Sequence, residues 1–327
     1  MELIPSTIKL AWPWLQSGKR LSVLIYHRVR PEPDPLTPDD PDVATFDWQM
    51  RLLARYTYIL PLPEAVQRLS DGTLPDRATA ITFDDGYADN HEHALPILQK
   101  HGLSATFFIA THFLNGGRMF NDTLIEALRR APEGTLDLTE AGLDAHQING
   151  SGTRLQALRS IIKQIKWHPV AERDAAVTAV AERIGATLPD DLMMTDKQVL
   201  ALRDAGMTIG AHTRTHPILA RLEAEQAREE IAGSRDDLRA LTGEAVELFA
   251  YPNGRPDQDY SHRDARLVAE ANFQAAFTTS MGAGASGDDR YQLPRFTPWA
   301  RQPAKFLAQL LRNTRYPTAI SSTEAVR

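Results

Sequence analysis

Short segments rich in β-branched and aromatic residues recur along this chain, and an amphipathic helical pattern follows most of them. This alternation is typical of βα units, which assemble into a parallel sheet or barrel. With 327 residues, the chain is long enough for one α/β barrel of about 250 residues plus insertions. The segments predicted as strands are 21–29, a short strand that begins at Tyr58, 78–83, 104–110, 207–212, 246–252 and 275–280, with 291–298 completing the series.

The βα rhythm is interrupted once, between about residues 115 and 191. Apolar residues there recur at helical spacing with few strand signals, so we predict a helical insertion. The chain is therefore divided into an N-terminal segment 1–20, a barrel 21–300 carrying the insertion, and a C-terminal helix with a polar, frayed tail at 301–327.

The N-terminus and the charge balance bear on compartment and partners. The apolar run 10–15 is preceded by Lys9, broken by Pro13 and followed by no cleavage site, and no run of about 18 apolar residues occurs anywhere. We expect a cytoplasmic protein whose N-terminal segment packs on the barrel. The alternative is that this segment contacts a membrane interface through Trp12 and Trp14. A net charge of −6 without a block of Lys and Arg argues against nucleic-acid binding.

Two adjacent carboxylates, Asp84 and Asp85, follow the strand predicted at 78–83. Like charges at the end of a buried strand repel one another, and a cation or a shared proton would relieve that cost. Active sites of α/β barrels are built at this end of the strands. A solvated turn is the alternative interpretation of the same residues.

Two histidines, His212 and His216, follow another predicted strand. The chain contains no cysteine, so any metal site must use histidine and carboxylate ligands. Two histidines and Asp85 would form a catalytic set, because such a set leaves positions open for water and substrate. One divalent ion, with zinc as the default, is the cofactor that this pattern predicts.

The segments Thr82–Gly86 (TFDDG) and His212–His216 (HTRTH) resemble the two metal-site motifs of the polysaccharide deacetylase family. This family is also called the NodB homology group or carbohydrate esterase family 4. The resemblance covers about residues 21–298 without the insertion. It implies a distorted (β/α) barrel and a divalent metal that serves to remove acetyl groups from glycans.

Carried over residue by residue, the resemblance implies that Asp85, His212 and His216 bind the metal and that Asp84 is the general base. The segment 249–254 resembles the family's third motif without its Arg. By analogy, the backbone N–H of Tyr251 is the candidate donor to the oxyanion, and a strand-terminating turn is the alternative.

The general acid and the residue that orients Asp84 depart from the usual pattern. The family's late histidine is missing, because no histidine follows His262. His27 resembles the early histidine of a branch with an N-terminal Tyr-His motif, and it is the candidate acid; a structural role at the end of the first strand is the alternative. Arg295 is the candidate partner of Asp84, although it could equally pair with Asp288 or Asp289.

The resemblance therefore implies a metal-dependent hydrolase that deacetylates N-acetylated sugars of an oligo- or polysaccharide or of its lipid-linked precursor. A metal-dependent amidase on a non-sugar amide and a glycan-binding pseudoenzyme are the alternatives. The insertion could shape the cleft, mediate homo-oligomerisation, or dock a membrane-bound polysaccharide synthesis complex.

Overall fold

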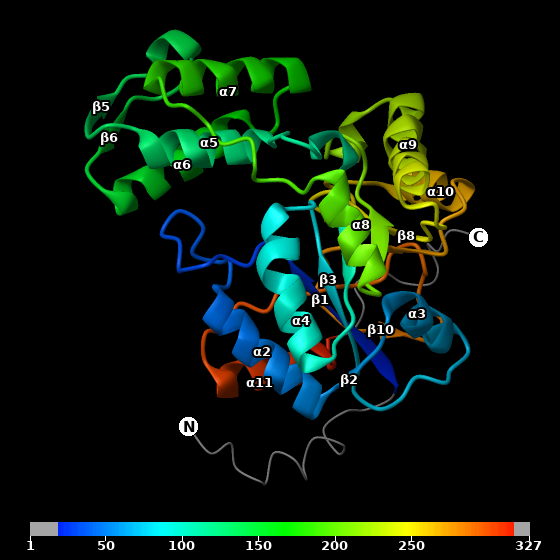
Figure 1. Ribbon diagram of the computed structural model, residues 1–327. Helices are drawn as coiled ribbons and strands as arrows, with labels where there is room; N and C mark the ends of the chain where they lie inside the picture. Colours follow the sequence, from blue (N-terminus) through cyan, green and yellow to red (C-terminus); the bar gives the residue numbers. More distant parts are fainter. Residues whose placement is uncertain (1–18, 317–327) are drawn as a thin grey trace.

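A computed structural model describes residues 19–316, so most of the predicted N-terminal segment and the end of the tail lie outside the described residues. A curled, mostly parallel sheet forms the centre, with helices packed around it (Figure 1). The strands follow the order β10-β1-β3-β4-β7-β8-β9, and β2 also pairs with β3. The strands are β1 (Arg20–Tyr26), β2 (Tyr58–Ile59), β3 (Ala78–Phe83), β4 (Thr106–Ile109), β7 (Thr208–Ala211), β8 (Leu248–Ala250), β9 (Ala275–Phe277) and β10 (Gly284–Ala285).

The segment predicted as the last strand closes the gap between β9 and β1. It pairs through single parallel bridges, Phe277 with Leu293 on one side and Leu24 with Phe296 on the other. Backbone hydrogen bonds from Phe296 N to Val23 O and from Ile25 N to Phe296 O, each 3.0 Å, fix this register. The predicted distorted (β/α) barrel is thus confirmed, with a seam that is held by isolated bridges rather than by a full strand.

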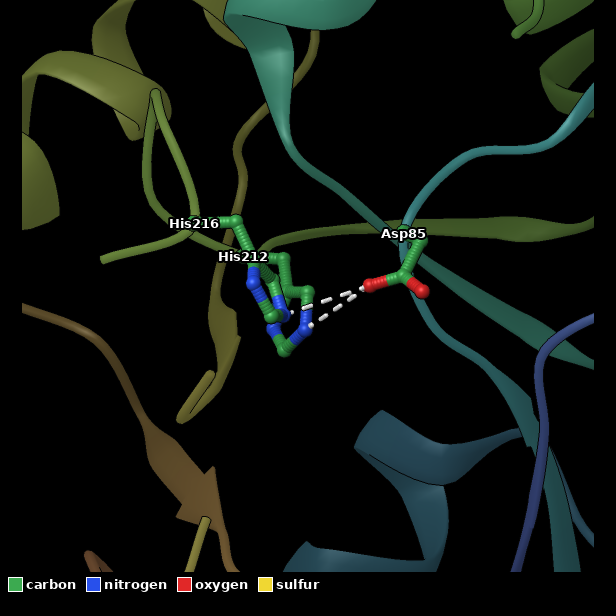
Figure 2. A group of neighbouring side chains, drawn as sticks. All are labelled: Asp85, His212 and His216. Atoms are coloured by element: carbon green, nitrogen blue, oxygen red, sulfur yellow. Dashed lines mark ion pairs between the residues drawn. The ribbon is translucent and has the colours of Figure 1, made fainter. Parts of the chain in front are cut away.

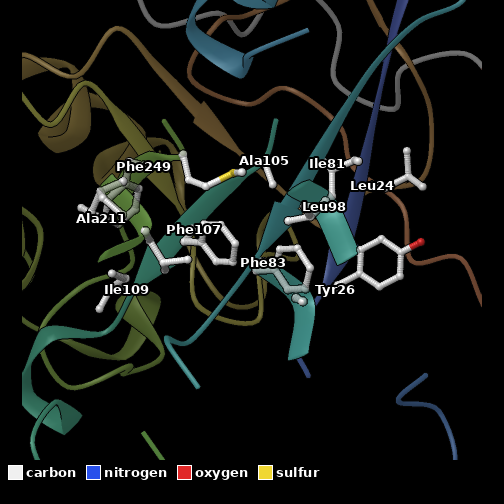
Figure 3. Close-up of a cluster of buried hydrophobic side chains, with 14 of the residues drawn as sticks. Leu24, Tyr26, Ile81, Phe83, Leu98, Ala105, Phe107, Ile109, Ala211 and Phe249 are labelled. Carbon is white, nitrogen blue, oxygen red and sulfur yellow. The ribbon is translucent and has the colours of Figure 1, made fainter. Parts of the chain in front are cut away.

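Alternate residues of the strands enter two different cores, as the two-residue period of a strand requires. Phe107 of β4 lies in the core between the sheet and its outer helices, where its ring stacks on Phe83 at 4.8 Å between centroids (Figure 3). Its neighbour Phe108 points to the other face, into the core that includes Phe277. Because both faces are covered, β3 is buried along its whole length.

The helices that surround the sheet follow the predicted order with shifted boundaries. The largest shift is at α9: the sequence pattern predicts this helix over residues 217–241, but it begins at Ala224, because a short 3₁₀ turn, Leu219–Arg221, comes first and Glu223 forms the capping box. The helices around the barrel are α2 (Val43–Tyr56), α3 (Leu62–Ser70), α4 (Leu95–His101), α8 (Asp196–Asp204), α9 (Ala224–Thr242), α10 (His262–Glu270) and α11 (Pro303–Asn313), with a π-helical turn Asn90–Ala94 before α4.

The segment between β4 and α8 forms a helical layer at one end of the barrel (Figure 1, green). It contains α5 (Phe120–Arg130), α6 (Ser151–Ile165) and α7 (Val170–Ile184), which enclose a hydrophobic core of their own. A small antiparallel sheet, β5 (Gly134–Leu136) with β6 (His146–Ile148), was not predicted from the sequence. Among the described residues, no helix is long and apolar enough to cross a bilayer.

One ion pair ties this layer to the loop after β1. Arg129 of α5 donates two hydrogen bonds to the Asp34 carboxylate, at 3.0 and 2.6 Å. Burial opposes ionisation of Asp34, but the hydrogen bonds from Arg129 and from the Leu36 backbone, together with the charges of Arg129 and Arg30, outweigh it and lower the pKa of Asp34 from 3.8 to about 2.

We therefore expect Arg129→Met to destabilise the protein by about 0.2–1 kcal/mol at pH 7, the range of partly exposed ion pairs. A lowered native pKa stabilises the fold above the unfolded pKa, and this contribution is lost as pH falls from about 4 toward 2. The difference in the free energy of unfolding between wild type and variant should therefore shrink in that window. A difference that stays constant down to pH 3 would contradict the assignment.

Candidate metal centre and active site

The two motifs meet because their strands are neighbours through β4. β3 pairs with β4, and β4 pairs with β7, all in parallel. Carboxyl ends of parallel strands lie at one edge of a sheet, so the residues after β3 and β7 converge there. Asp84 and Asp85 follow β3 directly, and His212 follows β7.

Asp85, His212 and His216 form a compact group of ligand atoms (Figure 2). Asp85 Oδ1 lies 3.4 Å from Nε2 of each histidine, and one ligand atom from each of the three residues lies within 4.8 Å of the others. Asp85 Oδ1 is buried and has no hydrogen-bond partner in the described part of the chain. A buried carboxylate oxygen facing two imidazole nitrogens fits the ligand set of a divalent cation.

The ring nitrogens of the histidines are set up for ligation. His212 Nδ1 lies 2.7 Å from the carbonyl oxygen of Ala250, which makes Nδ1 the protonated nitrogen and leaves the Nε2 lone pair facing Asp85. Burial lowers the pKa of His216 to about 4, so this ring is neutral at neutral pH, the form that binds metal. Burial also opposes charge on His212, but the charges of Asp84 and Asp85 and the contact with the Ala250 carbonyl together outweigh it and raise the pKa of His212.

The backbone is strained at the site. Among non-glycine residues with positive φ are Asp85 (81°), Thr213 (64°), His216 (53°) and Asn253 (58°). Each such residue costs on the order of 1–3 kcal/mol, so the surrounding structure must hold it in place. These four residues follow three different strands, β3, β7 and β8, and Asp85, His216 and Asn253 line the same pocket, which ties the strain to the site.

The loop that carries His216 is held from outside the barrel by α9. The Glu230 carboxylate accepts hydrogen bonds from the backbone N–H groups of Arg214 and Thr215, each at 2.8 Å. Asp237 binds the Arg214 guanidinium at 2.7 and 2.8 Å. The Glu- and Arg-rich pattern of residues 221–239 is typical of a solvated helix face, but Glu230 and Asp237 instead hold the loop of the HTRTH motif.

Asp84 is not part of the group formed by Asp85, His212 and His216; its carboxylate is paired with Arg295. Two hydrogen bonds of 2.7 Å join the guanidinium to both oxygens of the carboxylate, and Arg295 has no exposed surface. Burial opposes ionisation of Asp84, but the charges of Arg295 and His212 and the hydrogen bonds from Arg295 together outweigh it and lower the pKa of Asp84. Of the partners weighed for Arg295, the structure selects Asp84 over Asp288 and Asp289.

His27 follows β1 and faces the pocket as an exposed side chain. It lines a cavity of about 290 Å³ together with Asp85 and Asp122. Asn90 Nδ2 donates to the His27 carbonyl at 2.8 Å, and Asp89 accepts from Arg28 Nε at 2.7 Å. The position of Asp89 and Asn90 before the next helix predicts that they cap it, and this prediction is wrong: their side chains hold the segment after β1.

The assignment of Tyr251 as oxyanion donor is corrected by the structure. Its backbone N–H donates to the carbonyl of Phe277 at 3.1 Å, in the pairing of β8 with β9. Its hydroxyl donates to the carbonyl of Tyr291 at 2.9 Å, and the side chain is buried. Asn253, two residues later, is the residue of this turn that lines the pocket with Asp85 and His216.

Asp122 is a site residue that sequence reasoning missed. It lies on α5 of the insertion, is buried, and accepts from the Tyr87 hydroxyl at 3.1 and 3.2 Å. Burial raises the pKa of Asp122 to about 6, partly offset by Arg28 and reinforced by Asp85. No local signal marks it, because it follows no barrel strand and belongs to no motif.

Comparison with known proteins agrees with this geometry. Residues 71–276 match the sequence profile of the family described as polysaccharide deacetylase. YxkH of Bacillus subtilis, provisionally named a polysaccharide deacetylase, is 20% identical over 285 residues, which cover 87% of this chain and 74% of YxkH.

Two solved structures share the fold with low sequence identity. The Streptococcus pyogenes deacetylase PplD, in complex with acetate, is 20% identical with a TM-score of 0.60, covering 90% of this chain and 99% of PplD. IcaB from Ammonifex degensii is 18% identical, also with a TM-score of 0.60, covering 90% of this chain and 97% of IcaB. The barrel therefore belongs to a known architecture.

The buried ion pair of Arg295 with Asp84 should contribute to the stability of the fold. We expect Arg295→Met to lower the free energy of unfolding by about 3–5 kcal/mol, because it leaves Asp84 buried without a counter-charge. Urea unfolding of the variant, with Arg290→Met as a matched control at an exposed arginine, measures this. A loss below about 1 kcal/mol for Arg295→Met would show that the pair does not hold this part of the barrel.

Proposed function

Because the chain belongs to the polysaccharide deacetylase family, we propose that it is a metal-dependent hydrolase that removes acetyl groups from N-acetylated sugars of a glycan. Proteins of this family act on acetylated glycans. The observation that carries the proposal is the unpaired Asp85 oxygen facing two histidine nitrogens, beside a second carboxylate whose charge is maintained by Arg295.

We assign the ligands to Asp85, His212 and His216, and zinc is the proposed ion because the set combines imidazole with one carboxylate and no thiolate. A divalent ion bound there would lower the pKa of a water molecule and polarise the acetyl carbonyl. Asp84 is the proposed general base. Its carboxylate remains ionised at neutral pH, because Arg295 lowers its pKa, so it can accept the proton of the attacking water.

His27 is the proposed general acid, in keeping with the Tyr-His branch of the family. It lines the same cavity as Asp85, and its exposed ring can donate a proton to the departing amine. Since the N–H of Tyr251 is already hydrogen-bonded, we place the donor to the developing oxyanion in the turn at Asn253. Asn253 lines the same pocket as Asp85 and His216.

We further infer that the substrate is a polymer or a lipid-linked glycan. Pockets on both sides of Asp85 are lined partly by the insertion, which fits a polymer or a lipid-linked glycan better than a free small amide. Docking to a membrane-bound synthesis complex and self-association are proposed roles of the outer face of the insertion. The division into barrel, insertion and terminal segments is the proposed domain organisation.

Substitution of the base and of a ligand should have different effects. We expect Asp84→Asn to abolish acetate release while metal remains bound, and His212→Ala to lose both metal and activity. Acetate release from an N-acetylglucosamine oligomer, with metal content by elemental analysis, separates the two. Since either change affects a buried group, thermal unfolding of each variant shows that it is folded at the assay temperature. Full activity in either variant would contradict the mechanism.

His27→Ala tests the acid. We expect the turnover number to fall about 10²–10⁴-fold, the usual contribution of a general acid, with metal content unchanged. His101→Ala is the matched control. His101 is the last residue of α4, and its Nε2 lies 2.9 Å from Asp47 Oδ1 on α2, away from the cavities that contain Asp85. A rate within a few-fold of wild type would show that another group protonates the amine.

A further inference from the structure

Trp167 is an exposed tryptophan surrounded by positive charge. It lies in the turn between α6 and α7, and 41% of its surface is exposed. Lys166 Nζ, Arg221 Cζ and Arg255 Cζ lie 5.5, 5.7 and 5.9 Å from its ring centroid. These distances are within the reach of cation–π attraction, and the three cations come from three separate segments.

The ring lines a cavity of about 460 Å³ between this turn and the 3₁₀ turn before α9. The charged groups that line it are all basic; among its described lining residues there is no carboxylate. Arg255, near the ring, is paired with Asp259 at 2.8 Å. Within residues 19–316, by contrast, no carboxylate forms an ion pair with Lys166 or Arg221, so both charges are available to a ligand.

This basic cavity continues into the proposed active site. Lys166, Arg173 and Ile218 line both the Trp167 cavity and the pocket of about 180 Å³ that contains Asp85 and His216. Lys166 also donates to Asn253 Oδ1 at 2.9 Å, so the same ammonium group lies between the tryptophan and the turn beside the metal centre. A glycan that extends from one pocket into the other must pass it.

We propose that Trp167, Lys166 and Arg221 form a subsite for a carboxylate-bearing sugar, so that the substrate is an acidic glycan in which uronic acids accompany the N-acetylated sugar. The proposal rests on the proposed deacetylase function. A flat aromatic face provides apolar surface for the C–H groups of a pyranose ring. The ammonium and guanidinium groups supply charge-assisted hydrogen bonds to its carboxylate.

The charge distribution favours this ligand over a neutral glycan. The chain as a whole carries a charge of −6, which repels a polyanion in general. A cavity whose charged groups are all positive therefore stands out locally, and a cleft lined by one sign of charge concentrates the field that attracts the opposite charge. A subsite for neutral sugars would not require unpaired cations beside its aromatic ring.

The experiment compares two hexasaccharides on the full-length protein. One alternates N-acetylglucosamine with glucuronic acid, and the other is made of N-acetylglucosamine alone. Binding is measured by calorimetry on metal-free protein, and acetate release on metal-loaded protein. We expect the acidic hexasaccharide to bind about tenfold more tightly, with an affinity that falls as salt rises.

Three variants assign the effect. Trp167→Ala should weaken binding of both hexasaccharides about tenfold, and Arg221→Gln should weaken only the acidic one. Trp299→Ala is the matched control, since Trp299 is 51% exposed and lines none of the three cavities described above. Equal binding of the two hexasaccharides, or unchanged binding in Trp167→Ala, overturns the inference. So does the finding that Trp167→Ala only disrupts self-association in sedimentation experiments.

The two proposals fail separately. If neither hexasaccharide releases acetate but the acidic one still binds through Trp167, the proposed function is wrong and the subsite stands. If acetate is released from both with no preference and no effect of Arg221→Gln, the deacetylase function stands and the acidic subsite is wrong.

Discussion

The ion pair between Arg295 and Asp84 is the interaction on which the geometry of the site depends. Arg295 lies on the short segment that closes the barrel between β9 and β1, and its side chain is fully buried. Its two hydrogen bonds to Asp84 compensate two charges that would otherwise be costly inside the protein. The same contact therefore joins the seam of the barrel to the end of β3 and keeps the carboxylate ionised.

Strain at the strand ends is the second constraint, and it explains why the supporting contacts are so numerous. Asp85 and His216 both adopt positive φ, a conformation that is uncommon for any residue other than glycine and that the surrounding structure must therefore hold in place. Glu230 on α9 fixes the loop that carries His216, while Asn90 fixes the segment that carries His27. Rigid outer helices thus hold a set of ligands that would not adopt this arrangement on a free loop.

The insertion is part of the site as well as a layer on the barrel. It has a hydrophobic core of its own, and it still contributes Asp122 to one cavity beside Asp85 and Lys166 to another. The barrel therefore supplies the reactive groups from its strand ends, and the insertion supplies walls to the pockets around them. In our proposal, this wall is also where the substrate is selected, through Trp167 and its cations.

The βα order, the buried strand that runs into TFDDG, and the HTRTH motif after another strand can all be predicted from the sequence alone. These are local patterns, and the carboxyl ends of parallel strands meet at one edge in any such fold. Only the folded structure shows which of its possible partners Arg295 binds, namely Asp84, and that the N–H of Tyr251 donates to the Phe277 carbonyl of β9. Only the folded structure shows that the insertion reaches the site with Asp122 and Lys166. Those contacts join residues far apart in the chain, and neither periodicity nor motif spacing carries information about them.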